Sequence, residues 1–261
     1  MRHQALRRNG LEILFHHLVA ILYLPLYAKS NATALQQDWP RIPLPSSKEQ
    51  LIHSAELGRQ IASLFDTDNP VAHVTTGTVG PELAAIAIVS RSGGGALNPD
   101  AGDLDVTAGW GHSGTGGAVM PGRGRAIEGD YSAQERESIL RAASALGLSD
   151  EKALSLLGGH RFDVYLNNFA YWKNLPARVW EYRVGGYQVI KKWLSYRERG
   201  ILGRSLTIDK THYVTAMARR IAAILLLQSQ LDTNYQTVTQ STYPWPSSNG
   251  ALSDNPSPTP R

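Results

Sequence analysis

The densest group of side chains that could do chemistry lies between residues 183 and 199, where basic and aromatic residues are interleaved. Basic groups pair with phosphates and aromatic rings pack or stack, so this mixture is typical of a nucleic-acid-binding surface. A solvated helix face with Trp193 in the core would show the same spacing, and the pattern alone leaves both interpretations open. The residues concerned are Arg183, Tyr187, Lys191, Lys192, Trp193, Tyr196, Arg197 and Arg199.

A sparser basic group lies in the glycine-rich stretch between residues 93 and 124. Arg123 and Arg125 occur there together with Trp110 and His112. A flexible glycine loop that carries arginines can follow a groove in DNA, but the same residues are consistent with an ordinary surface loop.

The same stretch contains two patterns that are also found in cofactor-binding loops. Asp105–Gly111 fits the D-x-x-x-G-x-G outline of an S-adenosylmethionine loop, and Gly109–Gly114 fits G-x-G-x-x-G. Both patterns bind a cofactor only where a strand leads in and a helix N-terminus follows. Residues 115–122 cannot begin a long helix, so we interpret these glycines as loop residues.

No arrangement of residues in the sequence points to catalysis or to a metal site. Cysteine is absent, which excludes a disulfide scaffold, a thiolate zinc site and a cysteine nucleophile. The zinc-protease, serine-hydrolase and phosphate-loop motifs are missing as well. Asp68–Val71 is not the Asn/Asp-Pro-Pro-aromatic loop with which amino-methyltransferases hold an extruded base. We predict no catalytic, cofactor-binding or metal-binding residues in this chain.

Composition sets the scale of the fold that must position these groups. The chain has 261 residues, with 26 basic and 22 acidic side chains, so it can form one large domain or two small ones. The resulting formal charge of +4 permits a polyanionic partner without requiring one. Near the N-terminus, Leu11, Leu14, Leu18, Ile21 and Leu22 fall on one helical face, which favours a packed amphipathic helix over a signal peptide or a membrane span.

The pattern along the chain predicts an α+β fold with helical N- and C-terminal segments around a glycine-rich strand-and-loop middle. Capping residues predict helix starts at Ser132, with Glu135, and at either Ser47, with Gln50, or Ser46, with Glu49. Further helices are expected to begin at Ser149 and Thr207. Alternation over Val179–Val184 predicts a strand, and a helix over Val189–Arg199 is expected to end at Gly200.

Several segments resemble a known family of proteins. Phe15–Tyr23, Pro25–Tyr27 and Asp38–Leu44 are similar to the segment that follows the methyltransferase core in adenine-specific DNA methyltransferases of large restriction–modification enzymes. Ala170–Trp172, Val179–Tyr182 and Gly185–Glu198 are more specific and resemble the C-terminal specificity (target-recognition) domain of Type ISP restriction–modification enzymes. Gly109–His112 and Met120–Gly124 also resemble that domain, so the resemblance covers roughly residues 11–235.

The resemblance implies a cytoplasmic protein, not associated with a membrane, that recognises a sequence in double-stranded DNA. It further implies a helix and proline strap over 1–45 and a DNA target-recognition domain over 46–235. Residues 236–261 are rich in Ser, Thr, Pro and Asn with little to bury, so we expect a disordered tail there. In the family, nuclease, translocase and methyltransferase domains use S-adenosylmethionine, ATP and Mg²⁺, but their motifs have no counterpart here, so we expect a fragment, a split gene product or a gene whose start was set at an internal methionine. Phosphate contacts are predicted for Lys191, Lys192, Arg197 and Arg199, and base or groove contacts for His112, Arg123 and Arg125.

Two alternatives remain open at this stage. The chain could be an interaction domain that docks on a separate methyltransferase or translocase subunit. Less consistent with its motifs, it could be an S-adenosylmethionine-dependent methyltransferase in its own right that uses the Asp105–Gly111 loop. Trp180, Trp193 and Tyr196 are expected in the core rather than as stacking platforms.

Overall fold

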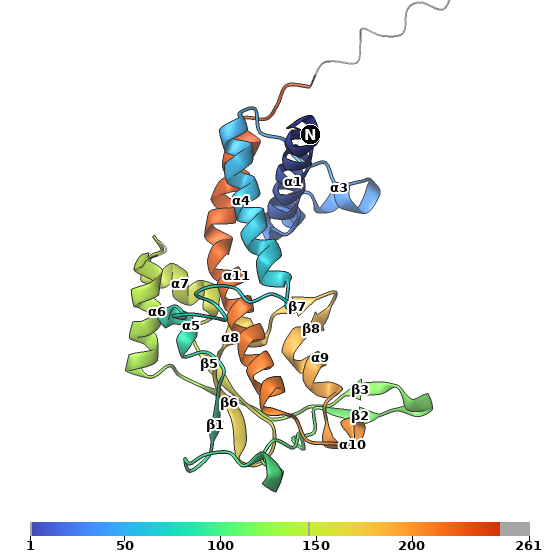
Figure 1. The fold of residues 1–261 in the computed structure, drawn as a ribbon, viewed down its shortest axis with the longest axis vertical. Helices are drawn as coiled ribbons and strands as arrows, with labels where there is room; N and C mark the ends of the chain where they lie inside the picture. Colours follow the sequence, from blue (N-terminus) through green and yellow to red (C-terminus); the bar gives the residue numbers. More distant parts are fainter. Residues whose placement is uncertain (1, 146, 246–261) are drawn as a thin grey trace, which may run out of the picture. The chain divides into compact units, whose positions relative to one another are not determined.

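The computed structural model describes residues 2–145 and 147–245, and it confirms the expected α+β class (Figure 1). Helices occupy both ends of this part of the chain, and short antiparallel strands occupy its middle. The elements are α1 (Arg2–Leu22), α2 (Pro25–Ser30), α3 (Ala32–Gln37), α4 (Lys48–Phe65), α5 (Pro81–Ala84), β1 (Ile88–Arg91), η1 (Pro99–Ala101), β2 (Gly111–Ser113), η2 (Thr115–Gly117), β3 (Val119–Pro121), β4 (Ala126–Gly129), α6 (Ala133–Ala145), α7 (Asp150–Leu157), β5 (Arg161–Tyr165), β6 (Ala170–Pro176), α8 (Ala177–Trp180), β7 (Arg183–Val184), β8 (Tyr187–Gln188), α9 (Val189–Ser195), α10 (Arg199–Leu202) and α11 (Ile208–Gln240).

The chain forms two compact units. The larger unit comprises Ile61–Ser229, and the smaller one comprises the residues up to Gln60 together with those from Gln230 onward. These structural units have other bounds than the segments expected from the resemblance, which end at residues 45 and 235. Those segments were defined by function, so they stay a prediction. Among the described helices, none contains a stretch that is long and apolar enough to cross a membrane.

A four-stranded antiparallel sheet with the order β1-β6-β5-β4 forms the centre of the larger unit. One face of the sheet is apolar, and its Val164, Ala170 and Trp172 are fully buried. The first part of α11 packs on this face, where the indole Nε1 of Trp172 donates to the carbonyl of Thr211 at 3.2 Å. Figure 1 shows this part of α11, in orange, lying along the sheet. Burial of aromatic and aliphatic area here provides the main stabilisation of the unit.

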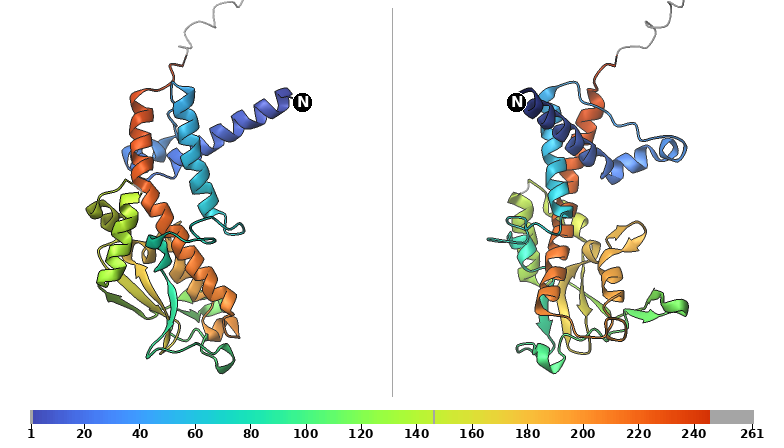
Figure 2. Two further views of the ribbon diagram at one scale, coloured as in Figure 1. Left: turned by 60° about the vertical axis from the view of Figure 1, so that its left-hand side comes forward. Right: turned by 45° about the vertical axis from the view of Figure 1, so that its right-hand side comes forward.

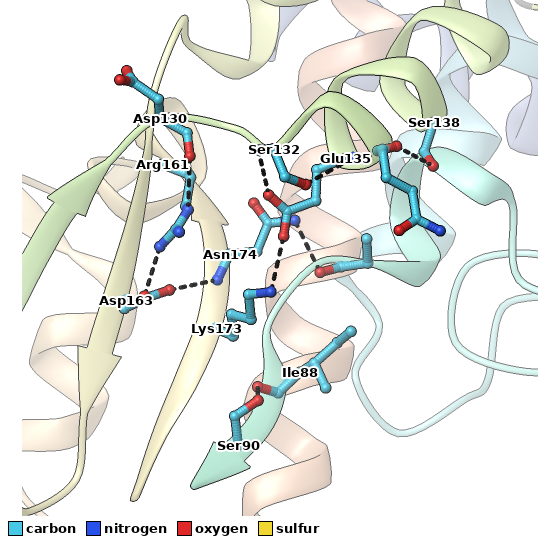
Figure 3. A network of polar contacts seen from close by, with 12 residues as sticks. Ile88, Ser90, Asp130, Ser132, Glu135, Ser138, Arg161, Asp163, Lys173 and Asn174 are labelled. Carbon is cyan, nitrogen blue, oxygen red and sulfur yellow. Dashed lines mark hydrogen bonds and ion pairs between the residues drawn. The ribbon is translucent and has the colours of Figure 1, made fainter. Parts of the chain in front are cut away.

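A network of polar contacts fixes an irregularity in this sheet (Figure 3). The register between β5 and β6 shifts beside Asp163, and Asn174 opposite has a left-handed φ of 60°. The Asp163 carboxylate accepts from the Asn174 backbone N–H at 3.0 Å and pairs with Arg161 at 2.6 Å. The Asn174 side chain donates to the carbonyl of Ala85, which links the irregularity to the chain before β1. The bulge is therefore a stabilised feature that leaves no buried backbone N–H of Asn174 unpaired.

The helix starts predicted from capping residues are confirmed. The Ser47 hydroxyl accepts from the N–H of Gln50 at 3.1 Å at the start of α4. Ser132 and Glu135 form a reciprocal capping box at α6, with distances of 2.9 and 3.2 Å. The Ser149 hydroxyl accepts from Lys152 at α7, and the Thr207 hydroxyl from Lys210 at α11.

Two predictions around residue 180 are wrong. The first two residues of the strand predicted over Val179–Val184 instead belong to the short helix α8, which begins directly after Pro176 at its N-cap. Only Arg183–Val184 is a strand, and it forms a hairpin with β8. The helix predicted to end at Gly200 instead ends at Ser195, and Gly200 lies inside α10.

In the smaller unit, α1 is packed as expected, but Ile21 is the one residue of its predicted apolar face that is fully buried. The face that is buried contains His17, Ala20 and Ile21, whereas Leu11 is 69% and Leu22 46% exposed. The cause is Gly58 of α4, which lies so close to the carbonyl of His16 that a Cβ would come within 1.7 Å of its oxygen. This close approach turns the predicted leucine face of α1 outward.

A buried polar network accompanies this contact. The imidazole of His17 is fully buried; its Nε2 lies 3.0 Å from the carbonyl of Pro43 and its Nδ1 2.8 Å from the Ser54 hydroxyl. Because a carbonyl can only accept, Nε2 carries the proton and Nδ1 accepts from Ser54. Ser54 in turn accepts from the Asn234 amide at 2.9 Å. Burial lowers the pKa of His17, so the ring is held in its neutral form.

An arginine side chain of α11 binds the C-terminal end of α4. In the larger unit, the buried guanidinium of Arg220 donates to the carbonyls of Ser63 and Leu64 in the last turn of α4 and to that of Asn69.

The prediction of a disordered tail from residue 236 is wrong at its start. The helix α11 continues to Gln240, so residues 236–240 belong to it. The remainder of that tail from residue 246 lies outside the described residues.

Candidate nucleic-acid interface

The basic and aromatic window predicted from the sequence lies on α9 and on the hairpin β7–β8 that precedes it. A second hairpin, β2–β3, is formed by part of the glycine-rich stretch, and its Gly111 packs against Ser195 at the end of α9. Figure 1 and the right-hand view of Figure 2 show both hairpins projecting from the same side of the larger unit, with α9 between them. The fold thus brings together two segments that are about 70 residues apart.

The base of hairpin β2–β3 is held rigidly. The carboxylate of Glu198 accepts from the backbone N–H groups of Gly109 at 3.1 Å and of Trp110 at 2.7 Å. The Trp110 side chain is fully buried, and its Nε1 donates to the carbonyl of Tyr165 at 2.7 Å. Because Glu198 directly follows the α9 segment, this bidentate contact couples the hairpin to α9.

The glycines of this stretch serve close packing. A Cβ on Gly111 would lie 2.1 Å from the Ser195 carbonyl oxygen, and one on Gly124 would lie 2.0 Å from the Trp110 ring. Gly109 has a left-handed φ of 80°. The segment that fits the S-adenosylmethionine pattern therefore leads into β2 and not into a helix, and its glycines are explained by backbone conformation and contact.

The tip of the same hairpin is open. A Cβ on Gly116 or Gly117 would meet nothing within 4 Å, although both residues have a left-handed φ. His112 and Met120 are register partners and both are exposed, Met120 by 47%. Directly opposed residues of an antiparallel pair lie on one face, so His112 and Met120 form a cross-strand pair directed to solvent.

Hairpin β7–β8 turns at Gly185 and Gly186, both with left-handed φ, and Arg183 braces the turn by donating to the Gly186 carbonyl at 3.0 Å. Its partners Val184 and Tyr187 are 54% and 61% exposed. The strand predicted at Val184 is confirmed there, but sequence reasoning missed the hairpin and its exposed tip, although the Gly-Gly pair is a typical hairpin signal.

Lys192 is the best-placed cation of the predicted set. Its Nζ lies 4.8 Å from the ring centre of Tyr187 and 4.7 Å from that of Tyr196. Tyr196 is 44% exposed, so the expectation that it lies in the core is wrong, whereas Trp180 is buried as expected. Lys191 is the adjacent residue on α9 and is partly exposed. Two tyrosines thus orient an ammonium group at the surface between the hairpins.

The two arginines of the set have structural partners. The guanidinium of Arg197 lies 3.8 Å above the Trp193 ring, which stacks on Tyr213 at 6.0 Å, and burial lowers the pKa of Arg197. The Nε of Arg199 is 3.2 Å from the carboxylate of Asp105. Both guanidinium groups therefore already contribute to packing or pairing within the protein. Phosphate contacts by these two arginines stay predictions.

The three residues predicted to contact bases or a groove lie in two places, beside hairpin β2–β3 and against the central sheet. His112 and Arg123 are exposed on and directly after hairpin β2–β3. Arg125 instead lies with its guanidinium 4.1 Å from the ring centre of Tyr165, which stacks on Tyr171 in the central sheet. Within the part of the chain that the structure describes, no group of three or more histidine, aspartate or glutamate residues is placed to hold a metal ion.

Comparison with known families gives one match, which extends over most of the chain. The model of the Type ISP C-terminal specificity domain matches residues 4–112 and 122–224. The residues between the two matched stretches, 113–121, form the outer part of hairpin β2–β3. No curated protein and no solved structure matches the chain.

Proposed function

The chain belongs to the family of Type ISP C-terminal specificity domains, and from this premise we propose that it recognises a double-stranded DNA sequence through α9 and the hairpins β2–β3 and β7–β8. The observation that carries the assignment to this surface is the position of Lys192 between two exposed tyrosines, on the side from which both hairpins project. Lysines at such a place bind phosphates and set the register of the protein on the duplex.

The charge of the surface supports a polyanionic ligand. Arg183, Lys191, Lys192 and Arg123 are exposed or partly exposed there. Of the acidic residues in the same window, Glu198 is engaged by the backbone of Gly109 and Trp110. An exposed two-stranded hairpin has the dimensions that the major groove admits. Phosphate binding by α9 together with groove contacts by the hairpins is the mechanism that this arrangement favours.

A second function is favoured by the smaller unit. Leu11, Leu14 and Phe15 of α1 are 69%, 38% and 58% exposed, and an exposed apolar helix face is typical of a protein-binding site. We propose that this face binds a methyltransferase or translocase subunit of the restriction–modification system in the cytoplasm. That subunit would supply the residues that bind S-adenosylmethionine, ATP and Mg²⁺, and the present chain would supply target choice.

The salt dependence of DNA binding tests the first proposal. For the wild type we expect log Kd against log salt concentration to have a slope of about 0.9 for each phosphate neutralised. Lys191→Ala and Lys192→Ala should each weaken binding to all duplexes alike and lower this slope by about 1. Lys152→Ala on α7, an exposed lysine on the other side of the larger unit in Figure 1, is the matched control. Unchanged affinity and slope in both α9 variants would refute binding through this surface.

A further inference from the structure

We propose that the outer part of hairpin β2–β3, residues 113–121 together with His112, is the element that determines which DNA sequence this chain selects. The inference rests on the proposed DNA-binding function and adds a division of labour to it. In this division α9 holds the duplex backbone, and the cross-strand pair of His112 and Met120 reads base edges in the major groove.

The extent of the family match is the first observation. Residues 113–121, which include Met120, are the interval that the family model leaves out, whereas His112, α9 and hairpin β7–β8 lie inside the matched stretches. His112 enters the inference as the register partner of Met120. A specificity domain has to combine a common way of holding DNA with a part that differs from one target to another. The interval outside the match is the part of this surface in which the chain departs from the family pattern.

The second observation is mechanical and separates the base of the hairpin from its tip. At the base, Gly111, Gly122 and Gly124 leave no room for a side chain, and Glu198 holds the backbone by two hydrogen bonds. At the tip, Gly116 and Gly117 face open space. The tip therefore extends from a fixed base, and within the described part of the chain no residue of 113–121 belongs to the hydrophobic core cluster.

The third observation is the chemistry of the exposed pair. A histidine ring can donate to or accept from a base edge through its two nitrogens. A methionine thioether is apolar and adaptable, and it suits contact with the C5-methyl group of thymine. Met120 also packs on the tip itself, since a Cβ on Gly114 would come within 2.7 Å of its Cγ. A short turn, closed by the Gly114 N–H donating to the Ala118 carbonyl at 2.7 Å, sets the direction of this pair.

Selection of bound duplexes from a random pool, followed by measurement of Kd for the selected site and for an unrelated duplex, tests the inference. Met120→Ala and His112→Ala should each lower the ratio of the two affinities by about ten-fold or more while leaving binding to the unrelated duplex and its salt slope unchanged. Ile88→Ala removes a similarly exposed apolar side chain from β1, outside α9 and both hairpins, and should keep both the selected sequence and the ratio.

A variant in which residues 114–118 are replaced by Asn-Gly provides a second readout. It should bind unrelated DNA as the wild type does and select a different sequence or none. Retention of the wild-type sequence and ratio in all three β2–β3 variants would overturn the inference while leaving the DNA-binding proposal intact. Failure of the wild type to bind any duplex would instead overturn the DNA-binding proposal, and with it the basis of this inference.

Discussion

The contact between Glu198 and the base of hairpin β2–β3 permits a quantitative prediction. The substitution Glu198→Gln keeps the shape of the side chain but replaces one carboxylate oxygen by an amide group that cannot accept from an N–H. Only one of the N–H groups of Gly109 and Trp110 can then be satisfied by the side chain. The Gly109 N–H is exposed and can be hydrated, whereas the Trp110 residue is fully buried.

The expected loss follows from the cost of weakening these bonds. A hydrogen bond to a charged group contributes about 1.5–3 kcal/mol, and removal of the charge affects both bonds. Allowing for hydration at Gly109, we expect Glu198→Gln to lower the free energy of unfolding by about 2 kcal/mol, and Glu198→Ala to lower it by about 3 kcal/mol. For a unit of this size, a loss of about 2 kcal/mol lowers Tm by roughly 4–8 °C.

Urea unfolding followed by far-ultraviolet circular dichroism measures the loss. Glu181→Gln, at an exposed glutamate just before the same hairpin–helix segment, is the control and should change stability by less than about 0.5 kcal/mol. If Glu198→Gln changes stability no more than this control, the carboxylate does not anchor the hairpin. In DNA binding, Glu198→Gln should reduce sequence discrimination more than affinity for unrelated duplexes, because the hairpin but not α9 is released.

Three further predictions concern other parts of the fold. Gly124→Ala should lower the free energy of unfolding by about 3 kcal/mol, because its Cβ would overlap the Trp110 ring, whereas Gly117→Ala should lower it by about 1–2 kcal/mol through its backbone conformation alone. Arg220→Met should lower it by about 2–3 kcal/mol through loss of the bonds that close α4. Urea unfolding measures both effects. Burial lowers the pKa of His17 below its unfolded value of 6.5, so neutral His17 stabilises the smaller unit above pH 6.5. This stability should decline as the pH falls below 6.5, measured as hydrogen exchange in α1 that is faster relative to the intrinsic rate at the same pH.

Each of these predictions has a result that would contradict it. Equal losses for the two glycine variants would show that contact with Trp110 is not the constraint at residue 124. Wild-type stability of the Arg220 variant would remove the capping role. A His17→Asn variant should lose the acceleration of exchange between pH 7 and 5, and an unchanged pH profile in that variant would exclude His17 as its source.

The sequence was sufficient for the features that depend on local rules. Helix starts at Ser47, Ser132 and Ser149 follow from side-chain capping, which is encoded within four residues. The family and the α+β class were also predictable, because motifs such as Gly185–Glu198 combine residue type with spacing. The grouping of basic and aromatic residues between 183 and 199 was recognised in the same way, and the structure distributes it over hairpin β7–β8, α9 and the start of α10.

The features that failed depend on contacts distant in the sequence. The leucine face of α1 is exposed because Gly58 approaches His16 from another helix, which hydrophobic periodicity within α1 cannot reveal. Gly109 and Gly111 matched cofactor patterns, but Gly109 provides a left-handed turn and Gly111 allows close contact with the Ser195 carbonyl. Arg197 and Arg199 looked like free cations until the structure placed Trp193 and Asp105 beside them.

The His17 network in the smaller unit has a consequence for the uniqueness of that unit's fold. Apolar area alone does not single out the observed packing of α1, since Leu11, Leu14 and Leu22 are apolar but exposed, whereas Ala20 and Ile21 are buried. A rotation that buried the leucines would leave Ser54 and Asn234 without His17 and would strand buried donors and acceptors. The network therefore opens an energy gap between two packings that hydrophobic burial would make nearly degenerate, and it keeps the leucine face free of the unit's own core.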